Sequence, residues 1–128
     1  MSYTIKRTIP DATMAEVDTR TRAALATQGF GVLTEIDVQA TMKKKIDKDM
    51  RPYKILGACN PNLAFHAIGA EPRIGAMLPC NVILRETDDG VEVSAVDPVA
   101  SMQAVNNAQL TEVAGQVRAM LETVIENI

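Results

Sequence analysis

The sequence predicts an α+β fold, in which an antiparallel sheet of about five strands carries its long helices on one face. Three observations indicate this class. Two stretches have apolar residues at helical spacing, several short stretches are rich in β-branched residues, and most of the short stretches follow one another directly. The expected order is therefore a strand, a helix, a run of strands and a closing helix. This differs from the strict strand–helix alternation of doubly wound folds.

The N-terminal part predicts one strand and one long helix. Residues 3–9 alternate with period two and include β-branched side chains, which is typical of a strand. Thr13 and Glu16 form a capping-box pattern, so we expect a helix over residues 14–28. Gly29 then suits the position just past a helix end, where the backbone is often left-handed.

The next part predicts two strands with a charged segment between them. Residues 30–38 indicate a second strand, and residues 53–58 indicate a short third strand that is mostly buried. The segment 40–48 is interpreted as a short helix or a loop, because Met42 and Ile46 are its only apolar anchors. Period two places five side chains of the second strand on one face: Phe30, Val32, Thr34, Ile36 and Val38.

Two helix starts are marked by proline. Asn60 suits an N-cap and Pro61 suits the first helical position, so residues 60–69 predict a helix. Asp97 and Pro98 repeat this arrangement and predict a short helix as far as about residue 105. The remaining expected elements are a turn or one helical turn over 71–75, two strands over 82–86 and 91–96 joined by a hairpin loop, and an amphipathic helix over 109–127.

Size and composition limit the possible functions. The 128 residues are expected to form a single domain, 1–128, and the net charge of −3 with few aromatic residues argues against a nucleic-acid partner. The sequence has neither a run of about 18 apolar residues nor a signal-peptide core, so we expect no membrane partner and a cytoplasmic location. There, the two cysteines are expected to be reduced thiols.

The two cysteines lie in matching pieces of sequence, Gly57-Ala58-Cys59-Asn60-Pro61 and Leu78-Pro79-Cys80-Asn81-Val82. Cys59 precedes a predicted helix start, where free N–H groups and the helix dipole favour a thiolate and a pKa below the usual value of about 8.5. Cys80 precedes a predicted strand. If the third and fourth strands lie close in the sheet, the two thiols come close together.

Several interpretations of this cysteine pair stay open. It could ligate a soft metal ion such as zinc or copper(I), cycle between dithiol and disulfide, or provide Cys59 as a nucleophile. Both cysteines could instead be small buried apolar residues, which is common for free cysteine. His66 lies about two turns into the predicted helix and away from Cys59, so a Cys/His catalytic pair lacks support. Whether the protein is an enzyme stays undecided.

Further residues extend the pattern over nearly the whole chain: Gly29-Phe30, Glu35-Ile36-Asp37 and Ser94-Ala95-Val96-Asp97-Pro98. Together with the two Cys-Asn blocks, they resemble the domain-of-unknown-function family 302 (DUF302). The resemblance implies a fold similar to the TATA-binding protein, small dimeric members and no established activity; a shared fold alone does not fix function. It also implies one site formed by Cys59, Asn60, Pro61, Pro79, Cys80, Asn81 and Asp97.

We therefore expect a cytoplasmic, homodimeric binding or sensing module. Its Cys59/Cys80 pair would bind a metal ion or a small cofactor, or would sense redox state. One alternative is a thiol-dependent enzyme with Cys59 as nucleophile. Another is a purely structural, dimeric interaction domain.

Overall fold

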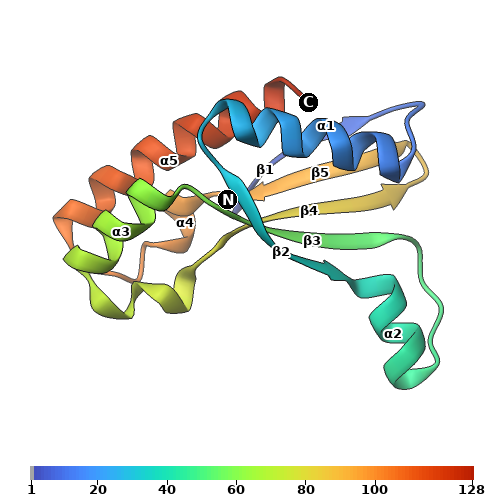
Figure 1. Ribbon diagram of the computed structural model, residues 1–128, viewed down its shortest axis with the longest axis horizontal. Coiled ribbons are helices and arrows are strands. Elements are labelled where there is room, and N and C mark those ends of the chain that lie inside the picture. Colours follow the sequence, from blue (N-terminus) through green and yellow to red (C-terminus); the bar gives the residue numbers. More distant parts are fainter. Residues whose placement is uncertain (1) are drawn as a thin grey trace.

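The computed structural model describes residues 2–128 and shows a five-stranded antiparallel sheet with two long helices on one face (Figure 1). This arrangement confirms the predicted α+β class. The strands lie in the order β1-β5-β4-β3-β2, so the chain crosses the whole sheet between its first and second strands. The strands are β1 (Thr4–Ile9), β2 (Gly31–Asp37), β3 (Tyr53–Cys59), β4 (Cys80–Thr87) and β5 (Gly90–Val96).

Helices α1 (Met14–Thr27) and α5 (Ala108–Glu126) cover the same face of the sheet (Figure 1). Alternate residues of the central strands point toward these helices and are fully buried, among them Leu56, Val82 and Leu84. They form one core with Val17 and Leu25 of α1 and with Leu121 and Val124 of α5. None of the helices within residues 2–128 is both long enough and apolar enough to cross a membrane.

Local capping explains why α1 begins and ends where the sequence predicts. The Thr13 hydroxyl accepts a hydrogen bond from the Glu16 amide at 3.1 Å, and the Glu16 carboxylate accepts one from the Thr13 amide at 3.3 Å. This is the predicted capping box. Gly29 follows the helix with a φ of +79°, a left-handed backbone that glycine adopts at little cost.

Strand β2 departs from the predicted alternation at Leu33. Val32 pairs with Ala58 and Thr34 pairs with Gly57, so Leu33 is an extra residue that forms a β-bulge. Val32 therefore shares the helix-covered face with Ala58, whereas Thr34 and Ile36 lie on the other face. The prediction that five alternating residues share one face is wrong, because the bulge reverses the alternation.

The segment after β2 is a helix, α2 (Val38–Ile46), which carries no buried residue. Val38 is its first residue and not the last of the strand, because the Asp37 carboxylate caps the helix by accepting a hydrogen bond from the Ala40 amide at 2.9 Å. The other helical segments are α3 (Pro61–Ala70), the 3₁₀ helix η1 (Pro72–Met77) and α4 (Pro98–Ser101). Helix α4 is shorter than the predicted 98–105.

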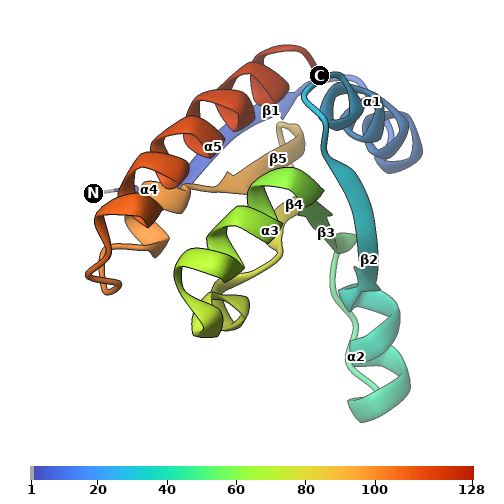
Figure 2. The same cartoon turned by 60° about the vertical axis from the view of Figure 1, so that its left-hand side comes forward.

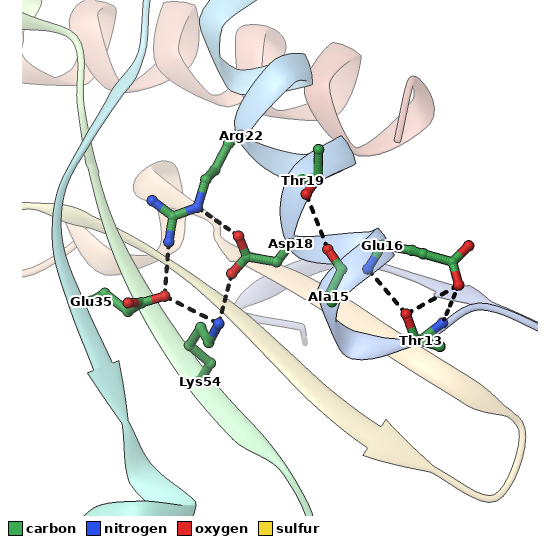
Figure 3. Close-up of polar contacts among 8 residues, drawn as sticks. All are labelled: Thr13, Ala15, Glu16, Asp18, Thr19, Arg22, Glu35 and Lys54. Atoms are coloured by element: carbon green, nitrogen blue, oxygen red, sulfur yellow. Dashed lines mark hydrogen bonds and ion pairs between the residues drawn. The ribbon is translucent and has the colours of Figure 1, made fainter.

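A compact charge cluster ties α1 to the β2–β3 edge of the sheet (Figure 3). Asp18 lies between Arg22, at 2.6 Å, and Lys54, at 2.8 Å, while Glu35 contacts both cations, at 2.8 and 3.1 Å. Burial alone would raise the pKa of the Asp18 carboxyl, but the hydrogen bonds from Arg22 and Lys54 outweigh it and hold this pKa below its ordinary value. The cluster balances two carboxylates with two cations, so we interpret it as structural.

The end of α5 is held by two arginines. The Arg7 guanidinium donates hydrogen bonds to the carbonyl oxygens of Ile125, Glu126 and Ile128 at 3.0–3.3 Å, and Arg20 donates to Ile128 at 2.9 Å. Cations are favourable at a helix C-terminus, where carbonyl groups lack intrahelical partners. These bonds fix α5 against β1 and α1, and α5 forms one wall of the site described next.

Candidate functional site

An apolar pocket of about 310 Å³ lies where β3 leads into α3 and where β4 begins. Helix α3 lies between α5 on one side and β2 on the other (Figure 2). Helix α5 contributes Leu110, Val113, Ala114 and Val117 to the lining, and α3 contributes Leu63, Ala64, Ala67 and Ile68. The pocket is therefore a space between helices above the cysteine-bearing end of the sheet.

Both cysteines line this pocket and are free, half-buried thiols. Cys80 is the first residue of β4 and pairs with Ala58, which is the neighbour of Cys59 in β3. Burial raises the pKa of the Cys80 thiol to about 11, and the nearby Cys59 adds to this rise through its charge. Cys80 is therefore protonated at neutral pH.

Asn60 reaches the pocket with both ends of its side-chain amide already bonded. Its oxygen accepts a hydrogen bond from the Leu63 amide at 3.3 Å, which is the predicted N-cap of α3, and its nitrogen donates to the Gln28 carbonyl at 3.3 Å. The second bond joins the start of α3 to the end of α1. Asn60 thus positions the pocket wall and uses half of its hydrogen-bonding capacity in doing so.

Pro79 lines the pocket and also packs against the sheet. A methyl group added to Gly57 would lie 2.8 Å from Cγ of Pro79, so the proline ring rests directly on the glycine. The peptide bond between Leu78 and Pro79 is cis. Glycine at position 57 therefore lets the Pro79–Cys80 corner approach β3.

Three of the seven predicted site residues lie outside the pocket lining. Pro61 is the exposed first residue of α3, and Asn81 is an exposed residue that pairs with Gly57 in the sheet. Because Cys80 packs against the helix-covered core, alternation places Asn81 on the opposite face. The pocket thus brings together Cys59, Asn60, Pro79 and Cys80.

Asp97, the third of these residues, joins two helices. Its carboxylate caps α4 by accepting hydrogen bonds from the Val99 and Ala100 amides at 2.9 and 3.4 Å, and it pairs with Arg118 of α5 at 3.0 Å. Burial alone would raise the pKa of the Asp97 carboxyl, but these bonds lower it overall. Its neighbour Pro98 is the residue that lines the pocket.

The donor set does not fit a closed zinc site. Such a site needs four ligands, and residues 2–128 contain no group of three or more His, Cys, Asp or Glu side chains able to hold one ion. His66 is exposed on α3 and is not part of the lining. The pocket therefore offers two thiols without the imidazole that a Cys/His catalytic pair requires.

The sequence profile described as "Domain of unknown function DUF302" matches residues 5–128. The chain belongs to this family. It is also similar to the crystal structure of an "uncharacterized conserved protein DUF302 from Bacillus stearothermophilus", with a TM-score of 0.92 and 22% identity over 99% of this chain and 98% of that one. At this identity the likeness shows the DUF302 fold. No curated protein matches the chain.

The apolar walls of this DUF302 pocket were not predicted as part of a site. The residues Leu110, Val113, Ala114 and Val117 were visible in the sequence as the apolar stripe of the closing helix. Such a stripe predicts burial, but it does not distinguish packing against protein from lining a space. The Cys-Asn blocks were the signal that located the pocket.

Proposed function

We propose that this DUF302 protein is a cytoplasmic binding module that holds a small apolar molecule beside the thiols of Cys59 and Cys80. One observation carries the proposal: a pocket of about 310 Å³, within the range of small-molecule sites, has an almost entirely apolar lining with two thiols in it. Burial of ~200 Å² of ligand surface at about 25 cal/mol per Å² would contribute ~5 kcal/mol. This free energy corresponds to a Kd of about 0.2 mM, so sub-millimolar affinity is a reasonable expectation.

The residues around Cys59 and Cys80 favour a binding role for the two thiols over a zinc site or a catalytic site. A zinc site lacks ligands among residues 2–128, and a thiol-dependent enzyme lacks an acid or base in the pocket lining other than the cysteines themselves. The thiols serve best as weak polar contacts within an apolar wall. A dithiol that responds to oxidation is compatible with this role, because both thiols are free.

A fluorescence titration with N-phenyl-1-naphthylamine tests the proposal, because this uncharged probe brightens in apolar surroundings. We expect saturable binding with a sub-millimolar Kd. Ala114→Phe should reduce binding at least tenfold, because Ala114 lines the pocket and is 4% exposed. Ala119→Phe, on the exposed side of the same helix, is the matched control.

Ala64→Phe, at a half-buried position of α3, fills the pocket from the other wall. It provides a second test if Ala114→Phe does not fold. Circular dichroism establishes that each variant is folded. Absence of probe binding to the wild-type protein, or equal binding by Ala64→Phe and Ala119→Phe, would rule the proposal out.

Self-association is a second candidate, and it is supported by the uncovered face of the sheet. Ile36, Ile55 and Ile83 are paired in register across β2, β3 and β4, on the face opposite α1 and α5. An apolar row on an uncovered face is a common feature of homodimer interfaces. Sedimentation equilibrium should show a dimer that Ile83→Lys dissociates, whereas Thr8→Lys at the edge of this face should leave it intact. A monomeric wild-type protein would remove this candidate.

A further inference from the structure

We infer that the ligand of the apolar pocket is an uncharged, hydrocarbon-rich molecule that places its polar group, if it has one, against the thiols of Cys59 and Cys80. This inference rests on the proposed binding function and specifies the chemical class of the ligand. It follows from the apolar side chains and thiols that line the pocket and from the absence of charged side chains in the lining.

The lining contains no charged side chain. All of its residues are apolar or small, apart from Asn60 and the two cysteines. An ion moved from water into such a site loses several kcal/mol of solvation that only a counter-charge or several hydrogen bonds can restore. The pocket provides neither, so a carboxylate, phosphate or ammonium group would have to stay outside it.

The polar side chains in the lining are the two free thiols and the partly bonded amide of Asn60. The Asn60 amide already bonds to the Leu63 amide and to the Gln28 carbonyl, which leaves one N–H and one lone pair for a ligand. Burial keeps Cys80 as a neutral thiol by raising its pKa to about 11. A thiol is a weak donor and a weak acceptor, which suits a carbonyl, ether or aromatic group better than an ion.

The pocket also limits the size and entry of the ligand. Its volume of about 310 Å³ lies at the lower end of the roughly 300–1,000 Å³ found for small-molecule sites, so a small ligand is expected. Leu33 and Ile68 line the pocket yet are 67% and 47% exposed. The opening therefore lies between the β2 bulge and α3, and its rim is apolar.

Two probes with one skeleton test the inference. N-Phenyl-1-naphthylamine is uncharged, and 8-anilinonaphthalene-1-sulfonate adds a single sulfonate to the same ring system. We expect the sulfonate to bind at least tenfold more weakly to the wild-type protein. Ile68→Lys should reduce or reverse this preference by placing an ammonium group at the rim of the pocket, whereas Ile68→Met, which has similar length without charge, should keep it.

Alkylation by iodoacetamide, followed by mass spectrometry, reports on the thiols independently. The uncharged probe at saturation should slow alkylation of Cys59 and Cys80 at least several-fold, and the sulfonate at the same concentration should not. Equal affinity for the two probes, or unchanged alkylation while the uncharged probe is bound, would overturn the inference. Equal affinity for the two probes would leave the proposed binding function intact, whereas that function fails if the uncharged probe does not bind in the pocket, which the comparison of Ala64→Phe with Ala119→Phe establishes.

Discussion

Thr34 and Gly57 lie so close across β2 and β3 that a methyl group on Gly57 would approach Oγ1 of Thr34 to 2.2 Å. The same methyl group would lie 2.8 Å from Pro79. Three segments therefore meet at a residue without a side chain, and one of them leads directly into Cys80. The positions of Pro79 and Cys80 in the pocket lining therefore depend on this contact.

Gly57→Ala is accordingly expected to destabilise the protein by ~2 kcal/mol, as overpacking at a rigid contact usually does. Neither the short threonine side chain nor the proline ring can move away easily. Urea denaturation measures the free energy of unfolding. Gly115→Ala, on the exposed side of α5 with no atom within 4 Å of the new methyl group, should instead stabilise by about 0.5–1 kcal/mol. Similar effects of the two substitutions would contradict this account.

Thr21→Val is expected to stabilise the protein by ~1 kcal/mol. Thr21 of α1 is fully buried, and its hydroxyl has no hydrogen-bond partner, so folding removes it from water without compensation. Valine has nearly the same shape. Thr19→Val on the same helix is the control, because the Thr19 hydroxyl is exposed and bonds to the Ala15 carbonyl. A thermal-unfolding midpoint that falls in Thr21→Val would show that the hydroxyl contributes favourably.

The charge cluster around Asp18 predicts a dependence of stability on pH. The pKa of the Asp18 carboxyl is lower in the folded protein than its ordinary value of 3.8, because Arg22 and Lys54 bond to it despite its burial. Its contribution to the free energy of unfolding is complete above pH 3.8 and is lost as the pH falls through the lower, folded-state pKa. Asp18→Asn should therefore be less stable than wild type at neutral pH, and the difference should shrink below about pH 4.

Chemical denaturation between pH 2.5 and 7 provides this measurement (the range brackets the ordinary pKa of aspartate). Asp89→Asn, in the exposed β4–β5 turn, removes a carboxylate of the same type outside the cluster. A difference between Asp18→Asn and wild type that stays constant over the whole range would show that the ion pairs do not perturb the Asp18 carboxyl.

The small number of metal ligands near Cys59 and Cys80 predicts that the purified protein holds little zinc. With only two thiols and no third ligand among the described residues, we expect sub-stoichiometric zinc after purification in both the wild type and Cys59→Ser/Cys80→Ser. Elemental analysis by plasma mass spectrometry gives the content. One zinc ion per chain in the wild type and none in the double variant would revive the metal interpretation.

Features fixed by neighbouring residues were predictable from the sequence. The capping box of Thr13 and Glu16 and the Asn60-Pro61 helix start involve hydrogen bonds over a few residues, so their patterns identify them directly. The bulge at Leu33 was not predictable, because it depends on the register with β3. The pocket depends on the spacing between α3 and α5, for which a periodic apolar stripe carries no information.

The extra residue at Leu33 also bears on how these molecules behave at high concentration. Strand β2 is an edge of the sheet, and a flat edge strand is a template onto which another chain can add. The bulge interrupts the regular spacing of backbone groups along this edge, and α2 follows immediately. The bulge at the pocket rim is therefore also expected to disfavour the addition of another chain along β2.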